Sequence, residues 1–363
     1  MGAYFQRLAR SRVFSWILLF CAYWFVSAAT FNGFYSKWGL SESSQRYNIA
    51  VMIDGSAHRP FVYRQLLPDI ANAFVQITPA DSLEKATGLL FYKDALRSKI
   101  TSPEARDPKY IWQYHIIYYL TFLSILAGCF TGRYALLVMG IEALPAAVAP
   151  AVLTLLMPFF QTNIGQFYDY PELMFMAAAV GLALRGPWVA ILPLSIVATW
   201  NKEAFLFFLM TLFPLLRTRL PTLGAGAITL SAMFLSGVTY LVVRGRFAGN
   251  PGGAVELHFG DAARIYSQLG EWFKLEVNYG VLGPKSFGLL PLVVLVGLGL
   301  RAWGGLPQAV RQHFILAVAV NLPLFIVLCY PREMRNLSML YVSLAAFMAL
   351  AMTPRSDGSS SAA

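Results

Sequence analysis

The chain has 363 residues, of which 57% are hydrophobic and 13% are charged, and its mean hydropathy is +0.57. Soluble domains carry about 25% charged residues, so this composition excludes a large soluble enzyme, a disordered chain and a fibre. The formal net charge is +10, but the charged residues lie between apolar runs of bilayer length and form no basic stripe for nucleic acid. The composition therefore predicts a polytopic membrane protein without a nucleic-acid partner.

Apolar runs define about ten predicted membrane helices of an all-α fold. The first run follows three arginines and is longer than the roughly 7–15 apolar residues of a signal peptide, so we interpret it as a membrane helix. Residues 1–353 are expected to form one transmembrane domain, and the Ser-rich segment 354–363 a disordered cytoplasmic tail. The ten predicted spans are about 13–34, 111–130, 135–158, 172–184, 187–200, 203–216, 222–243, 287–300, 313–330 and 337–353.

Arginines in the short loops set the expected orientation. If the N-terminus is cytoplasmic and the spans alternate, every short inner loop carries at least one arginine, as the positive-inside rule requires. Both termini are then cytoplasmic, and two long loops, about 35–110 and 244–286, lie on the outer side.

The first long loop is expected to carry short interfacial helices. One begins near Asp81-Ser82, a helix-capping pair. The other is predicted from the spacing of five apolar residues on one helical face, which is typical of an amphipathic helix at a membrane interface. These five residues are Leu66, Leu67, Ile70, Ala71 and Phe74.

A polar triplet, Asn201-Lys202-Glu203, separates two apolar runs of only 13 or 14 residues, each too short to cross a bilayer core of about 30 Å. Backbone can break at membrane depth only inside protein or beside a water-filled cavity. Asn201 is expected to cap the returning helix, whose N-terminus beside Lys202 suits an anion. A simple outer turn between two tilted helices is the alternative.

Four separate polar clusters fall on the predicted outer face. They are residues 58–64 (preceded by Asp54), 168–172, 201–203 and 331–336. Because the loop charges that set the orientation are different residues, their common side predicts a single outward-facing site.

The residue types in these clusters suit transfer of a sugar from a lipid phosphate. A carboxylate can deprotonate an acceptor, cations can bind a phosphate, and an apolar groove can hold a lipid tail. The candidate catalytic carboxylates are Asp54, Asp169 and Glu172. The candidate substrate-binding and phosphate-binding residues are Arg59, Tyr63, Arg64, Lys202, Glu203, Glu333 and Arg335.

These motifs resemble those of bacterial polytopic proteins that look like GT-C glycosyltransferases. The resemblance keeps the same order from Asp54 to Asn336. Residues 59–68 are similar to an RPFxYRxLxP segment, 168–173 to a tyrosine-aspartate–proline-glutamate segment, 201–203 to an N-(R/K)-E element and 333–336 to ExRN.

The resemblance implies a GT-C-like enzyme of the bacterial inner membrane, which uses a polyprenyl-phosphate sugar at the outer face and a glycan, lipid or protein acceptor. In it, Asp54 matches the acidic base of the first outer loop. The family often has two acidic residues there, whereas this chain has one. That departure leaves open a requirement for Mg²⁺ or Mn²⁺, and it leaves Asp169 or Glu172 as alternative bases. The four scattered histidines and the absence of HExxH predict no protein metal site.

Other interpretations explain part of the pattern. Asp54 can cap a turn, Arg59 and Arg64 can contact lipid headgroups, and Asp169 and Glu172 can complement a helix dipole. A carrier or flippase for a lipid-linked sugar or small anion also uses broken helices and buried charge. A carrier is expected to place polar residues on both faces, whereas here the short inner loops are poor in acidic residues.

Overall fold

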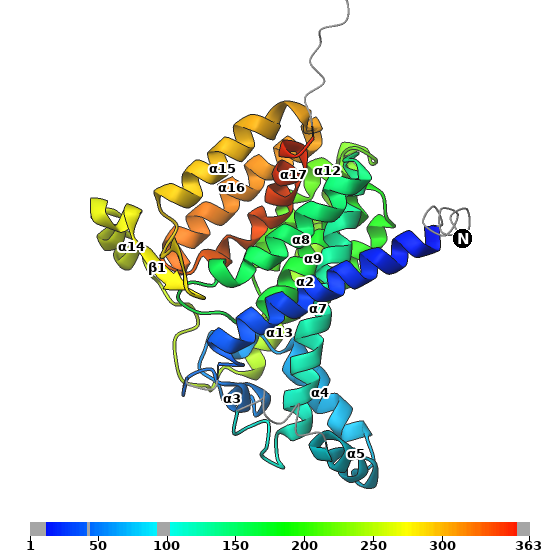
Figure 1. The fold of residues 1–363 in the computed structure, drawn as a ribbon, viewed down its shortest axis with the longest axis vertical. Coiled ribbons are helices and arrows are strands. Elements are labelled where there is room, and N and C mark those ends of the chain that lie inside the picture. Colours follow the sequence, from blue (N-terminus) through cyan, green and yellow to red (C-terminus); the bar gives the residue numbers. More distant parts are fainter. Residues whose placement is uncertain (1–11, 42–43, 93–101, 354–363) are drawn as a thin grey trace, which may run out of the picture.

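The computed structural model describes residues 12–41, 44–92 and 102–353 (Figure 1). The predicted tail 354–363 lies outside the described residues, as do Arg7 and Arg10. Within the described part, helices dominate, and the strands form a single two-stranded hairpin. An all-α architecture is therefore confirmed.

Six helices of the described chain are long and apolar enough to cross a membrane. An α-helix rises 1.5 Å per residue, so 18 residues extend about 27 Å, close to the thickness of a bilayer core. These helices support an integral membrane protein. They are α2 (Arg12–Trp38), α7 (Ile111–Val138), α8 (Ala143–Phe160), α13 (Thr222–Arg246), α16 (Gln308–Leu328) and the segment Met334–Ala351, which joins η5 (Met334–Leu340) to α17 (Tyr341–Ala351).

The other four predicted spans are shorter helices, so ten spans are not confirmed. The run 172–184 belongs to α9 (Asp169–Leu184), whose 16 residues extend about 24 Å. The remaining three are η2 (Trp188–Ala190) with α10 (Ile191–Asn201), α11 (Phe205–Thr211) with α12 (Phe213–Leu216), and α15 (Leu289–Ala302) with η4 (Trp303–Gly305).

One predicted boundary is also shifted. We expected a span to begin near residue 135, but α7 continues to Val138 and α8 begins at Ala143. The turn between them contains Gly140 at φ +89°, a left-handed backbone conformation that glycine adopts without steric cost.

The first long loop contains α3 (Ile49–Ile53), η1 (Phe61–Tyr63), α4 (Leu66–Ile77) and α5 (Ala80–Tyr92). Both predicted short helices are therefore present, as α4 and α5. The apolar face of α4 is divided, however. Leu66, Leu67 and Ala71 are buried in the core, whereas Ile70 and Phe74 are exposed. The helix thus contacts protein on one side and presents an apolar edge outward.

The second long loop contains α14 (Phe259–Tyr266), η3 (Leu269–Phe273) and the antiparallel strands β1 (Leu275–Asn278) and β2 (Val281–Pro284). Tyr279 and Gly280 connect the two strands and have φ values of +53° and +78°. Positive φ at both loop positions is characteristic of a type I′ turn, whose twist matches that of paired strands.

Helix α9 lies at the centre of the bundle, between α7, α10 and α17 (Figure 1). Its interior face carries small residues, among them the fully buried Ala177, Ala179 and Ala183. Small side chains allow neighbouring helices to approach closely in a membrane. This packing fixes the first turn of α9, which contains Asp169 and Glu172.

Arginines gather at the opposite end of the bundle from that first turn. Arg219 Nη1 donates to the Gly186 carbonyl oxygen (2.6 Å), just beyond the end of α9. Arg301 Nη2 donates to the Thr353 carbonyl oxygen (3.1 Å), just beyond the end of α17. The acidic residues at the beginning of α9 and the arginine loops therefore lie at opposite ends of the same helices.

The two long loops are tied together by backbone contacts. Asn250 Nδ2 donates to the carbonyl oxygens of Gly55 (2.8 Å) and Ala57 (2.9 Å), and the Arg59 amide donates to the Pro251 carbonyl oxygen (2.8 Å). Gly252 has φ +94°, and a Cβ there would lie 2.5 Å from the Arg59 carbonyl oxygen. Only glycine fits this contact without displacing backbone.

We expect Gly252→Ala to destabilise the protein by about 1–3 kcal/mol, because it adds both strain at positive φ and a backbone clash. Gly249→Ala is the control, since a Cβ at Gly249 meets nothing within 4 Å. Thermal unfolding in detergent compares the two variants. Equal unfolding midpoints would contradict the expected role of Gly252.

Candidate functional site

The polar triplet 201–203 lies at a break between two helices, as the sequence predicted. Helix α10 ends at Asn201, the backbone is extended at Lys202 (φ −161°, ψ 128°), and α11 begins at Phe205. The expected cap is wrong, because Ala204 occupies the capping position of α11. Asn201 instead donates through Nδ2 to the Tyr168 carbonyl oxygen (2.9 Å), which fixes the break against the residue before α9.

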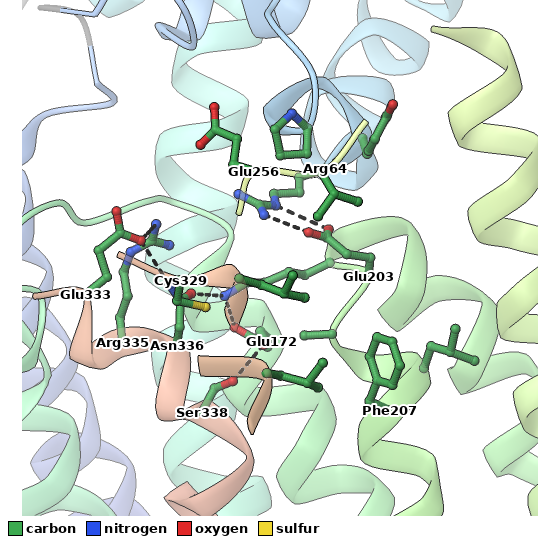
Figure 2. Close-up of a pocket in the computed structure, with 18 of the residues that line it drawn as sticks. Arg64, Glu172, Glu203, Phe207, Glu256, Cys329, Glu333, Arg335, Asn336 and Ser338 are labelled. Atoms are coloured by element: carbon green, nitrogen blue, oxygen red, sulfur yellow. Dashed lines mark hydrogen bonds and ion pairs between the residues drawn. The ribbon is translucent and has the colours of Figure 1, made fainter. Parts of the chain in front are cut away.

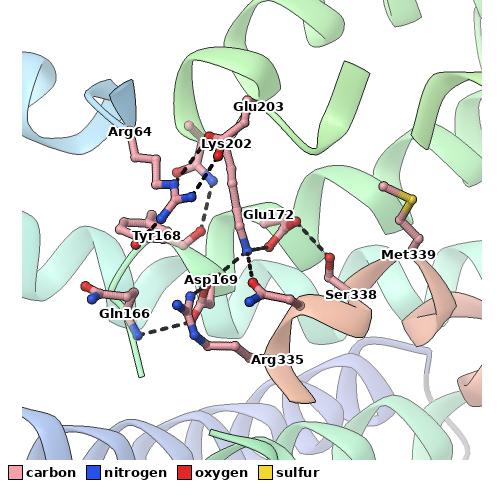
Figure 3. A network of polar contacts seen from close by, with 12 residues as sticks. Arg64, Gln166, Tyr168, Asp169, Glu172, Lys202, Glu203, Arg335, Ser338 and Met339 are labelled. Carbon is pink, nitrogen blue, oxygen red and sulfur yellow. Dashed lines mark hydrogen bonds and ion pairs between the residues drawn. The ribbon is translucent and has the colours of Figure 1, made fainter. Parts of the chain in front are cut away.

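Lys202 enters the core and binds three acceptors (Figure 3). Its Nζ lies 2.6 Å from Glu172 Oε2, 3.4 Å from Asp169 Oδ1 and 3.3 Å from Asn336 Oδ1. Asp169 and Glu172 are three residues apart in the first turn of α9, so both carboxylates face the same ammonium group. The break is thereby joined to α9 and to η5.

Arg335 of η5 is the second buried cation of this group. Its Nη1 lies 2.8 Å from Asp169 Oδ1 and its Nη2 lies 3.1 Å from Glu333 Oε2. Asn336 Nδ2 donates to the same Glu333 oxygen (2.9 Å). The Arg335 Nε is buried and has no hydrogen-bond partner among the described residues.

Arg64 is held between Glu203 and Tyr168. Its Nη2 and Nε reach the two Glu203 oxygens at 2.7 and 3.3 Å, and its Nη1 donates to the Tyr168 hydroxyl (2.6 Å). Burial opposes the charge on Glu203, but the guanidinium outweighs it and holds the pKa of Glu203 below its ordinary value. Burial likewise opposes the charge on Arg64, and Glu203 raises the Arg64 pKa above its usual range. This pair is ionised at neutral pH.

We call these residues the charged cluster. Its members come from four segments of the chain that are far apart in sequence. They are Arg64, Tyr168, Asp169, Glu172, Lys202, Glu203, Glu333, Arg335 and Asn336.

The charged cluster borders a cavity of about 260 Å³, here called the central cavity (Figure 2). Glu172, Lys202, Phe207 and Tyr240 line the central cavity. Glu256 and His258, from the second long loop, also line it. Its lining thus combines ionised groups with aromatic rings, which suits a polar ligand that carries a ring.

A second pocket of about 270 Å³, here called the apolar pocket, adjoins the first. Its lining comes from α8, α15 and α17 and is almost entirely aliphatic and aromatic, with residues such as Leu153, Leu290 and Leu344. Arg335 and Ser338 line both spaces. The central cavity and the apolar pocket therefore meet at these two residues.

Most of the predicted site residues converge. The central cavity is lined by Tyr63, Arg64, Glu172, Lys202, Glu203, Glu333 and Arg335. Asp169 does not line it but lies directly behind, bound to Lys202 and Arg335. Tyr63 is buried, and its hydroxyl has no partner in the described part of the chain.

Asp54 and Arg59 do not line the central cavity. Helix α3 is only five residues long and ends at Asp54, where Gly55 turns the chain with φ +68°. The exposed Asp54 carboxylate accepts from Lys109 Nζ (2.8 Å) and from the Tyr110 hydroxyl (2.5 Å). The Asp54 side chain therefore contacts residues near the beginning of α7 rather than the charged cluster.

Some lining residues were not predicted. Ser338 donates to Glu172 Oε1 (2.8 Å), but it follows the motif 333–336 and no sequence signal identified it. Glu256, His258 and Asp261 lie close together in the sequence, and this local grouping of acids with a histidine is the signal that could have identified them. In the structure, His258 lies 3.0 Å from Asp261 and 3.7 Å from Glu256.

The charged cluster does not fit a divalent cation. Within the described ranges, no group of three or more His, Cys, Asp or Glu side chains is placed to hold a metal. The carboxylates of Asp169 and Glu172 both face Lys202, whose ammonium occupies the position that a cation would take between them.

Comparison of the chain with protein-family models, with curated proteins and with solved structures yields no match. The geometry of the charged cluster, the central cavity and the apolar pocket therefore carries the functional conclusion.

We expect Lys202→Met to destabilise the protein by about 3–5 kcal/mol, because it leaves two buried carboxylates without their shared cation. Lys109→Met is the matched control, since Lys109 also pairs with an acid but its side chain is 61% exposed. Exposed pairs contribute about 0–1 kcal/mol. Unfolding midpoints in detergent test the difference, and equal midpoints would show that Lys202 has no such role.

Proposed function

We propose that this protein is a membrane glycosyltransferase that takes a sugar from a polyprenyl-phosphate donor. The observation that carries the proposal is the junction at Arg335 and Ser338, where a polar cavity meets an apolar pocket. A lipid-linked sugar has the same two-part chemistry, with a hydrocarbon tail on one side of a phosphate and a hydroxylated ring on the other. The GT-C-like motifs of the sequence agree with this assignment.

The apolar pocket suits the hydrocarbon end of such a donor. Its lining residues, among them Met157, Phe287 and Val294, offer no charged group except Arg335 at the junction. Burial of isoprenoid carbon there is favourable by about 25 cal/mol per Å² relative to water. This gain selects a lipid carrier over a free sugar phosphate.

Arg335 is the group best placed for the donor phosphate. Lys202 already binds three acceptors, and both ends of the Arg64 guanidinium are occupied by Glu203 and Tyr168. Arg335 lines both the central cavity and the apolar pocket. A charge-assisted hydrogen bond from its guanidinium group stabilises the phosphate as it leaves.

Glu333 is the carboxylate best placed to act as the base. Both oxygens of Asp169, Glu172 and Glu203 accept hydrogen bonds from the charged cluster or from residues next to it. The two bonds to Glu333 both end on Oε2, which leaves Oε1 without a donor among the described residues. Its side chain is also 18% exposed, so an acceptor hydroxyl reaches it from the cavity.

In the proposed step, the acceptor hydroxyl transfers its proton to Glu333 and its oxygen attacks the anomeric carbon. The bond between that carbon and the phosphate oxygen breaks, and the phosphate leaves with the electron pair. Arg335 compensates the charge that develops on the leaving oxygen. The new glycosidic bond stays with the acceptor, and polyprenyl phosphate remains in the apolar pocket.

The proposed orientation places the site outward and both termini in the cytoplasm of a bacterial inner membrane. Arginine loops lie at one end of α9 and α17 and the charged cluster at the other, which agrees with the positive-inside rule. Nucleotide sugars are cytosolic, so an outward site requires a donor carried by lipid.

Glu333→Gln is expected to lower kcat by about 10²–10⁴, the usual contribution of a general base. Glu256→Gln is the control, because Glu256 lines the same cavity but is bound by Arg46 and lies near His258.

Asp54→Asn is expected to retain turnover, since Asp54 lies outside the cavity. The assay follows labelled sugar from synthetic polyprenyl-phosphate donors into an envelope extract, with the protein in liposomes.

Three results would contradict this proposal. Full turnover by Glu333→Gln would exclude Glu333 as the base, and loss of turnover in Asp54→Asn would assign that role to Asp54. Movement of the labelled lipid across the bilayer with no sugar transfer would identify a carrier instead.

Val294→Trp is expected to fill part of the apolar pocket and raise KM for the lipid donor about tenfold, equivalent to roughly 1.4 kcal/mol of lost binding. Leu300→Trp is the control on the same helix, because Leu300 is exposed and does not line the pocket. Steady-state kinetics over donor concentration separate KM from kcat. An unchanged KM for Val294→Trp would place the lipid tail elsewhere.

A further inference from the structure

The β1–β2 hairpin has a side-chain pattern opposite to that of a hairpin in water. Along β1, Leu275 and Val277 point outward and are exposed, whereas Glu276 is half-buried and Asn278 is buried. Sheets that face water on one side direct apolar residues inward and polar residues outward. Strands that face lipid show the reverse alternation.

Polar contacts fix the inward side of the hairpin to the ends of two helices. Lys37 of α2 donates to Asn278 Oδ1, and Asn278 Nδ2 donates to Glu276 Oε1 (2.8 Å). The Tyr279 hydroxyl donates to the Gly33 carbonyl oxygen (2.5 Å), and its ring meets Phe159 of α8 edge-on. The hairpin is therefore held in one orientation, and its apolar side cannot turn toward the core.

The outward side forms a continuous apolar surface. Val277 and Leu282 are directly opposite each other in the strand register, and they are 68% and 70% exposed. Leu275 extends this surface along β1, because residues two apart in a strand share a face. We call Leu275, Val277 and Leu282 the apolar hairpin face.

The apolar hairpin face continues into the apolar surface of α15. Pro284 ends β2 and lines the apolar pocket together with Leu290 of α15. Helix α15 presents further exposed aliphatic residues, including Val293. Figure 1 shows the hairpin at the edge of the bundle, beside the beginning of α15.

We propose that the apolar hairpin face lies in the lipid bilayer, at the boundary between headgroups and acyl chains, and borders the entrance of the apolar pocket. Lys274 and Lys285 are neighbours at the open end of the hairpin, where the Lys285 amide donates to the Lys274 carbonyl oxygen (3.1 Å). Lys274 pairs with Glu271, and Lys285 beside the apolar hairpin face suits an anionic headgroup above acyl chains. The apolar hairpin face therefore fits a lipid environment.

The test measures whether residues of the apolar hairpin face contact lipid or water. Val277→Cys and Leu282→Cys are made in a chain whose Cys21, Cys129 and Cys329 are replaced by Ala, and each is labelled with bimane. The protein is reconstituted in nanodiscs of phosphatidylethanolamine and phosphatidylglycerol. Brominated acyl chains report contact with lipid, and iodide reports contact with water. We expect loss of fluorescence with brominated lipid and little loss with iodide at both positions.

Two further variants calibrate the result. Val293→Cys on α15 is the lipid control, and Pro108→Cys, between the exposed Asp107 and Lys109, is the water control. Leu275→Cys is a second reporter if either hairpin variant fails to fold. Iodide quenching like that of Pro108→Cys would overturn the proposal, and protection from both quenchers would overturn it in favour of a protein cover. The measurement needs no substrate, so it stands apart from any failure of glycosyl transfer.

Discussion

The ion pairs of Lys202 are the interaction on which the site depends. One ammonium group joins the break between α10 and α11 to the first turn of α9 and to Asn336 of η5. A lysine inside a membrane protein is tolerated where carboxylates compensate it, and removal of either partner leaves an uncompensated buried charge. The charges that hold the bundle together are thus the same charges that border the central cavity, so stability and function are coupled there.

The sequence predicted the class of protein and the convergence of its polar motifs, because both depend on patterns along the chain. Apolar length identified the six long helices, and the triplet 201–203 marked the break between α10 and α11. Ten spans are not confirmed, because four of the apolar runs form helices or pairs of helices shorter than the six long ones. Hydropathy measures composition and does not fix where a helix ends, so the span expected to begin near residue 135 begins at Ala143, after the turn at Gly140.

The roles of individual carboxylates could not be predicted in the same way. Asp54 matched a family motif, but the short helix α3 turns its side chain toward Lys109 and Tyr110. Glu333 gained importance only when the partners of every carboxylate were known, since it alone keeps an oxygen without a donor in the described part of the charged cluster. Such a distinction arises from hydrogen-bond geometry between distant segments, and no local pattern records it.

The junction at Arg335 and Ser338 has a practical consequence for biochemistry. The apolar pocket is lined by carbon rather than by hydrogen-bonding groups, so it distinguishes one hydrocarbon chain from another only weakly. A detergent with a single alkyl chain and an anionic head has the same two parts as a prenyl phosphate, a hydrocarbon tail and a negative charge. Under the proposed function, such a detergent competes with the lipid donor at micellar concentrations, and zwitterionic or bulky sterol-based surfactants are the better choice for enzymology.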